Sequence, residues 1–237
     1  MKILFQKAEA LGFSLLFLKR GFWEAMRKIT ALRAGGGHRG RVRVYLDDKF
    51  ALSLEPEVVL TARLAVGHEL SGEQINELAT RDDFERCLKA AAHYLDYRPR
   101  SEAELRARLS RRGFQEGSVV AVVARFKEHG LVDDAAFAHF WQDNRQAFRP
   151  QSQSLTRLEL KRKGVAEEVI NGVIATADDD ENAYRAAQRK ARSLPLGEYR
   201  VFRQRLGDYL RRRGFSYGVI NNTVEQLWRE MKADSAD

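Results

Sequence analysis

The chain has 237 residues, and its 41 Lys and Arg residues exceed its 33 Asp and Glu residues to give a formal net charge of +8 at pH 7. This length allows two or more compact modules, and the positive excess favours a polyanionic partner, either nucleic acid or an acidic protein surface. The single cysteine, Cys87, excludes an internal disulfide and a thiol-based zinc site, so a reducing, cytoplasmic setting is the simplest interpretation.

Residues 1–27 are expected to form a helical or disordered extension. They contain the apolar run Leu11–Leu18, which is too short to span a bilayer because a membrane helix needs roughly 20 apolar residues. No small-x-small cleavage site follows this run, and Lys19 and Arg20 come directly after it. The pattern therefore does not favour a signal peptide.

Residues 28–82 are expected to form a small antiparallel β-hairpin and a short helix. Polar and apolar residues alternate over 41–46 and again over 49–54, with two aspartates between them, which predicts two strands joined by a tight turn. A lone hairpin is marginally stable in water, so we expect it to pack on a helix over 71–79. Ser71, with a glutamine three positions later, fits the capping box that begins such a helix.

From residue 84 onward the chain is predicted to be helical and to repeat. A basic segment that closes with a glycine and a hydrophobic residue occurs three times, and its glycines are Gly113, Gly164 and Gly214. The spacings are 164 − 113 = 51 and 214 − 164 = 50 residues, and such a fixed period is typical of tandem structural repeats. Counted from the residue that follows each glycine, apolar residues recur at positions +5, +8 and +9. This spacing predicts one buried helix face in each repeat. The residues at these positions are Val119, Val122 and Val123; Ile170, Val173 and Ile174; and Ile220, Thr223 and Val224.

Each repeat is expected to contain three helices, and the first repeat shows the signals most clearly. A helix over residues 84–97 should end before Pro99, because the residue ahead of a proline disfavours helix. Ser101 should begin the second helix with a capping box completed by Glu104. Gly113 should end that helix as a left-handed residue, and a third helix should carry the valine face.

Acidic residues are expected at the helix N-termini that open the other two repeats, at 133–134 and at 178–181, where the helix dipole favours negative charge. The predicted fold class is therefore all-α, with tandem three-helix-bundle repeats in an elongated, curved array after the small N-terminal β-hairpin. The predicted repeat boundaries are 83–131, 132–178 and 179–237.

The sequence contains no pattern that predicts catalysis. It lacks the nucleotide-binding patterns G-x-x-x-x-G-K-[ST] and G-x-G-x-x-G, and its five histidines have no ligand spacing. No Ser or Cys lies in a nucleophile elbow or beside a plausible base. We therefore expect no cofactor, no metal, no catalytic residue and no enzymatic activity.

The basic clusters that precede the three glycines are the candidate binding sites. Cations near a helix C-terminus complement its dipole at roughly 0.3–1 kcal/mol each, which explains one or two of them per helix. Three in a row in two of the repeats exceed that need, and their recurrence predicts positive patches at regular intervals for a polyanion. The candidate filament- or DNA-binding residues are Arg108, Arg111, Arg112, Lys161, Arg162, Lys163, Arg203, Arg211, Arg212 and Arg213.

Three segments of the sequence resemble the RecX family of recombination regulators. The most specific, at residues 92–114, reads A-x-Y-L-x-x-R-x-R-S-E-x-E-L-x-x-x-L-x-x-x-G-F. A second, at 130–138, reads G-L-V-D-D-x-x-F-A, and a third, within 155–165, contains L-K-x-K-G-V. The resemblance begins near residue 28 and extends essentially to the C-terminus.

The chain departs from the family pattern in three places. Residues 1–25 have no counterpart, and the loop at 150–154 lacks the glycine that family members usually carry there. Ser118 replaces a residue that is usually apolar.

The resemblance implies a cytoplasmic protein of three tandem three-helix bundles that lies along the groove of the RecA filament on single-stranded DNA. There it is expected to modulate, usually to inhibit, the ATPase, strand-exchange and co-protease activities of RecA, with a part in DNA repair, homologous recombination and the SOS response. We expect a monomer whose partners are the RecA filament and the single-stranded DNA within it, with free DNA as a further candidate and no membrane.

Two other functions stay open at this point. The three-helix repeats resemble helix-turn-helix domains, so a general nucleic-acid-binding protein that acts without RecA is the alternative. A helical scaffold that binds an acidic protein, with no DNA, is the third.

Overall fold

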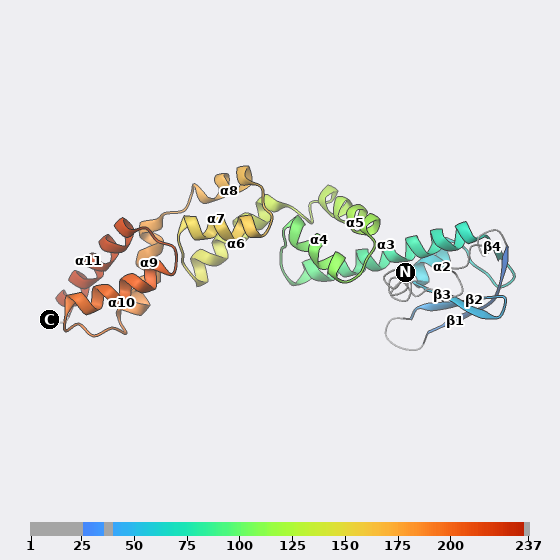
Figure 1. The fold of residues 1–237 in the computed structure, drawn as a ribbon, viewed down its shortest axis with the longest axis horizontal. Coiled ribbons are helices and arrows are strands. Elements are labelled where there is room, and N and C mark those ends of the chain that lie inside the picture. The colour runs from blue at the N-terminus through green and yellow to red at the C-terminus, as the bar shows by residue number, and fades with distance from the viewer. Residues whose placement is uncertain (1–25, 36–39, 235–237) are drawn as a thin grey trace, which may run out of the picture. The chain divides into compact units, whose positions relative to one another are not determined.

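The computed structural model describes residues 26–35 and 40–234, which fall into two compact units (Figure 1). Unit 1 contains the described residues up to Arg98 together with Leu105–Leu131, and unit 2 contains Pro99–Glu104 and the chain from Val132 onward. The elongated array concerns their relative placement and stays a prediction, and the predicted extension over residues 1–27 lies almost entirely outside the described residues.

Unit 1 begins with a four-stranded antiparallel sheet in the order β3-β2-β1-β4. Its strands are β1 (Arg27–Ala34), β2 (Val42–Leu46), β3 (Lys49–Leu54) and β4 (Glu69–Leu70). The predicted hairpin is confirmed as β2 and β3, and both turn residues, Asp47 and Asp48, have positive φ angles of 48° and 63°. That conformation matches the twist of the two strands, which is why Asp and Asn are favoured there.

The sheet is larger than the predicted hairpin, because β1 and β4 complete it. In β1 only Ile29 is buried, and a register irregularity between Ile29 and Ala31 interrupts the alternation of polar and apolar residues. A strand without a clear period of two gives little local signal. Its pairing with β2 shields one edge of the hairpin, which accounts for the stability that a lone hairpin lacks.

The helix α3 (Gly72–Tyr97) is a single helix of 26 residues, so the two separate helices predicted over 71–79 and 84–97 were wrong. Its N-terminus has the expected capping box between Ser71 and Gln74. Two buried aspartates, Asp82 and Asp83, lie at its centre and broke the apolar pattern that sequence reasoning relied on.

These two carboxylates connect α3 to its neighbours in unit 1. Asp82 accepts hydrogen bonds from the Arg41 guanidinium at 2.9 Å and from the backbone N–H of Glu55 at 2.6 Å. Glu55 is the N-cap residue of the short helix α2 (Pro56–Thr61). Asp83 accepts from the backbone N–H of Gln115, the N-cap residue of α5 (Glu116–Glu128), at 2.9 Å. Buried carboxylates persist only when hydrogen bonds and opposite charges compensate their desolvation.

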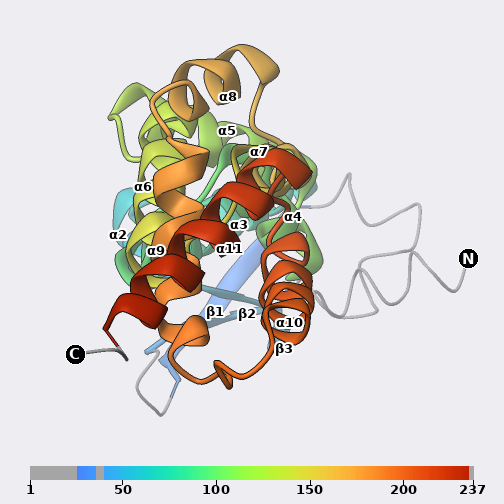
Figure 2. The same ribbon diagram turned by 90° about the vertical axis from the view of Figure 1, so that its left-hand side faces the viewer.

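The remaining helices continue the three-helix pattern. They are α4 (Glu102–Arg111), α6 (Asp134–Phe148), α7 (Gln153–Arg162), α8 (Glu167–Ile174), α9 (Asp179–Ala191), α10 (Tyr199–Arg211) and α11 (Tyr217–Ala233). In unit 2, α6, α7 and α8 pack pairwise, and so do α9, α10 and α11, as Figure 2 shows for the last three. Each set encloses its own apolar core.

The periodic signals in the sequence predicted these cores correctly. Leu109, Leu160 and Leu210 are fully buried. The nine residues of the predicted downstream faces are also buried, including the polar Thr223. Gly113, Gly164 and Gly214 have φ angles of 89°, 77° and 84°, which confirms the left-handed helix ends. Cys87 is fully buried as expected, and burial, with the nearby Asp83 charge, raises the pKa of its thiol to about 12.

Two matched contacts in unit 2 fix helix N-termini onto the neighbouring repeat. At the start of α4, the Ser101 hydroxyl donates to the Lys163 carbonyl at 2.6 Å, and the backbone N–H of Glu102 donates to Asp134 at 2.8 Å. Gly164 lies directly against the side chain of Ala103, so no Cβ fits there.

The start of α7 repeats the arrangement. The backbone N–H of Ser152 donates to the Arg213 carbonyl at 3.0 Å, the N–H of Gln153 donates to Asp179 at 2.8 Å, and Gly214 lies against Ser152. The acidic pairs therefore divide their roles. Asp133 and Asp178 cap their own helices, as predicted, and the aspartate after each one caps the helix of the preceding repeat.

Candidate functional site

The three candidate cations of the first repeat are exposed on unit 1, and two of them lie at the ring of Tyr94 on α3. The Arg108 guanidinium lies 4.4 Å from the centre of that ring, and Arg112 lies 5.9 Å from it and donates to the tyrosine hydroxyl at 3.2 Å. Arg111 folds back on its own helix, where its Nε donates to the Ala107 carbonyl at 3.1 Å. Tyr97, one turn further along α3, is 84% exposed.

The electrostatics of this cluster suit an anion. Burial raises the pKa of Tyr94, but the hydrogen bonds from Arg112 and Arg108 and their charges outweigh it and hold the pKa below its usual value. Two guanidinium groups beside an aromatic ring can bind a phosphate and also offer a surface on which a base stacks. Sequence reasoning did not select Tyr94 as a site residue, because its partners lie on another helix.

The second repeat divides its three cations between two environments. Lys161 and Arg162 are exposed, and Lys161 has only a 3.8 Å ion pair with Glu167. The side chain of Lys163 is 18% exposed, and its ammonium is 2.6 Å from a Glu104 carboxylate oxygen and 4.1 Å from the centre of the Trp141 ring. Its charge thus stabilises the contact between α7 and the first turn of α4.

The third repeat shows the same division. Arg211 and Arg212 are exposed, and Arg211 forms a 3.2 Å ion pair with Asp208. Arg213 is half-buried, and its guanidinium lies 4.5 Å from the centre of the Tyr209 ring and donates to the Pro150 carbonyl at 3.4 Å. Tyr209 lies in the last turn of α10 and precedes Arg213, just beyond the end of that helix, by four residues, so the sequence spacing hints at this packing.

Arg203 belongs to a second arginine–tyrosine cluster, which lies in unit 2. It is exposed and donates to the hydroxyl of Tyr217 at 3.0 Å and to Asn221 at 3.3 Å. The hydrogen bond with Asn221 and the positive charge of Arg203 lower the pKa of Tyr217, whose side chain is largely exposed.

The candidate cations therefore fall into two classes. In the second and third repeats, the cation directly before the glycine packs on an aromatic ring and on the neighbouring repeat, and the two cations before it face solvent. Eight of the ten candidates are exposed: Arg108, Arg111, Arg112, Lys161, Arg162, Arg203, Arg211 and Arg212. Lys163 and Arg213 are the half-buried pair.

Neither a metal cluster nor a membrane-spanning helix is found in the part of the chain that the structure describes. Among residues 26–35 and 40–234, no three His, Cys, Asp or Glu side chains lie together as a metal site would require. No helix within these ranges combines the length and the apolar composition that crossing a membrane requires.

Comparison with known proteins identifies the three-helix repeats. Residues 87–126 match the first three-helix domain of RecX, residues 133–174 match the second and residues 178–224 match the third. The chain belongs to the RecX family.

Curated relatives and solved structures agree with this assignment. The regulatory protein RecX of Clostridium perfringens strain SM101 is 28% identical over 207 residues, which cover 85% of this chain and 97% of the relative. The regulatory protein RecX of Bacillus licheniformis is 27% identical over 204 residues, which cover 85% and 78%. A crystal structure of regulatory protein RecX aligns with a TM-score of 0.59 at 26% identity, over 84% of this chain and 99% of that one. A crystal structure of RecX from Lactobacillus salivarius shares the fold, with a TM-score of 0.54 at 21% identity.

Proposed function

We propose that this RecX-family protein is a non-enzymatic regulator that binds the RecA filament on single-stranded DNA. It acts as a cytoplasmic monomer and inhibits the ATPase, strand-exchange and co-protease activities of RecA. The observation that carries the proposal is the recurrence of exposed cations beside the left-handed glycine in all three repeats. A helix C-terminus gains little from more than one or two such charges, so their number favours an anionic partner.

A nucleoprotein filament offers the kind of surface that these repeats suit. Each cation that neutralises a phosphate releases counterions, so several weak contacts from successive repeats add into one salt-dependent interaction. The two arginine–tyrosine clusters, Tyr94 with Arg108 and Arg112 and Arg203 with Tyr217, add aromatic faces on which unpaired bases stack.

Those two clusters also favour the second candidate function, a general nucleic-acid-binding protein that acts without RecA. RecA-dependent ATP hydrolysis on single-stranded DNA, titrated with this protein, separates the two. The proposal predicts inhibition at concentrations well below those that coat the DNA. Inhibition only when free DNA is saturated would mean that competition for DNA suffices, and the second function would replace the first.

A further inference from the structure

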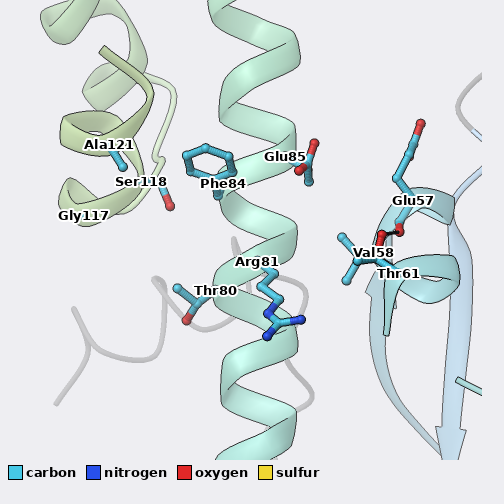
Figure 3. Close-up of a pocket in the computed structure, with 10 residues that line it drawn as sticks. All are labelled: Glu57, Val58, Thr61, Thr80, Arg81, Phe84, Glu85, Gly117, Ser118 and Ala121. Carbon is cyan, nitrogen blue, oxygen red and sulfur yellow. Dashed lines mark hydrogen bonds between the residues drawn. The ribbon is translucent and has the colours of Figure 1, made fainter. Parts of the chain in front are cut away.

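Unit 1 contains a cavity of about 340 Å³ between α2, the middle of α3 and the first turns of α5 (Figure 3). Val58 of α2, Phe84 of α3 and Ala121 of α5 supply apolar wall, and Figure 3 shows the Phe84 ring between α3 and the turn of α5 that carries Ser118. The volume lies within the range of ligand-binding cavities. Apolar wall that stays in contact with water is unfavourable, so an apolar group that enters the cavity is stabilised there.

The wall also holds a polar atom whose hydrogen bonding is incomplete. Ser118 is 5% exposed, and its Oγ has no hydrogen-bond partner among the described residues. Buried hydroxyl groups in folded proteins nearly always have a partner. An occupant that brings a backbone amide as well as apolar side chains therefore satisfies both parts of the wall.

The corresponding contacts in unit 2 are closed. There Gly164 and Gly214 pack directly against the N-terminal turns of the helices that precede them, α4 and α7. In unit 1, Asp82 accepts from the backbone N–H of Glu55 at the N-terminus of α2, as Asp134 and Asp179 do for α4 and α7. A Cβ added to Gly113, however, would meet no heavy atom of the described residues within 4 Å. In unit 1, the described residues leave a cavity open between α2, α3 and α5.

We propose that the apolar run of residues 11–18, which precedes the described part of the chain, fills this cavity. The run offers Leu and Phe side chains, which suit the apolar wall, and backbone amides, which can bond to the Ser118 hydroxyl. It is also within reach. Arg27, where the described chain begins its first strand, pairs with Leu70, two residues before α3 begins. From there to the cavity the chain must cover the distance from Gly72 to Phe84, which is 12 positions or about 18 Å along the helix. The nine residues from Leu18 to Arg27 can span up to about 30 Å.

Thiol labelling tests the proposal on the full-length chain. Ala121→Cys places a reactive group at the cavity, and the buried native Cys87, whose pKa is raised to about 12, stays unreactive. The labelling rate is measured in the otherwise unchanged chain and in a chain that also carries Phe13→Asp, Leu16→Asp and Phe17→Asp. Ser110→Cys, on the exposed side of α4, is the matched control in both backgrounds.

The proposal predicts that Ala121→Cys reacts at least ten-fold more slowly in the unchanged chain than in the triple-aspartate chain, and that Ser110→Cys reacts equally in both. A peptide of residues 7–20, added to the triple-aspartate chain, should restore the protection, and a scrambled peptide should not. Equal labelling of Ala121→Cys in the two backgrounds would overturn the proposal. If the rates are equally slow, a different occupant such as a second copy covers the cavity, and if they are equally fast, nothing does.

Discussion

Replacement of Lys163 by alanine separates the packed cations from the exposed ones. The change removes an ammonium that is 2.6 Å from Glu104, where the two side chains are 18% and 21% exposed, and that lies over the Trp141 ring. A hydrogen bond to a charged group contributes about 1.5–3 kcal/mol and a cation–π contact about 0.5–1 kcal/mol. Since the contributions share one group and are not additive, we expect a loss of about 2 kcal/mol.

The assay is urea unfolding monitored by tryptophan fluorescence in chains in which Trp23 and Trp228 are replaced by phenylalanine, so that Trp141 alone reports on the second repeat. For a chain of this size, 2 kcal/mol corresponds to a fall of about 4–8 °C in Tm. Arg162→Ala is the matched control, because Arg162 is exposed and precedes Lys163 directly; its effect should stay within about 0.5 kcal/mol. Binding to the RecA filament should change more for Arg162→Ala than for Lys163→Ala when both are measured below their unfolding transitions. Equal stability of the two variants would refute the structural role given to Lys163.

Three further predictions concern residues that hold the repeats together. Burial raises the pKa of Asp179, so the stability linked to its protonated form is lost as pH rises through that raised pKa. Asp179→Asn keeps an acceptor for the Gln153 N–H and should match or exceed the wild-type urea midpoint at pH 7. Asp179→Ala removes the acceptor and should lower the free energy of unfolding by about 1–2 kcal/mol. Gly214→Ala should destabilise the chain by clearly more than Gly113→Ala in thermal unfolding, because both positions have positive φ but only Gly214 packs against another residue, and equal losses would contradict the packing. Burial raises the pKa of Glu159, but hydrogen bonds from Arg145, Trp141 and Gln151 outweigh burial and lower that pKa. The contribution of Glu159 to stability is therefore present above the ordinary carboxyl pKa and is lost as pH falls through the lowered pKa. Glu159→Gln should make the free energy of unfolding depend less on pH in the acid range.

Sequence patterns predicted the helical repeats because their signals are local. A glycine that ends a helix, such as Gly164, is recognised from the few residues around it. A buried face such as Ile170 with Val173 is recognised from residues within one or two helical turns. The strand β1 was missed because a register irregularity between Ile29 and Ala31 disturbs its alternation of polar and apolar residues. The continuity of α3 was missed because Asp82, a buried polar residue, looked like a boundary.

The candidate site was predictable in outline and not in detail. A run of cations before Gly214 is visible in the sequence, but which of them faces solvent depends on the packing around it. Lys163 is held by Trp141 and Glu104, which lie on two other helices, so no local pattern reveals its role. The arginines around Tyr94 form a cluster for the same reason.

The account rests on exposed cations from all three repeats acting together on one polyanion. The most direct test is the salt dependence of binding to the RecA–single-stranded DNA filament, measured for the wild type and for three variants that each lose one exposed pair to alanine: Arg108 with Arg111, Lys161 with Arg162, and Arg211 with Arg212. If each pair neutralises two phosphates, the slope of log K against log salt becomes shallower by about 1.4 in every variant. The same slope in the wild type and all three variants would contradict the account.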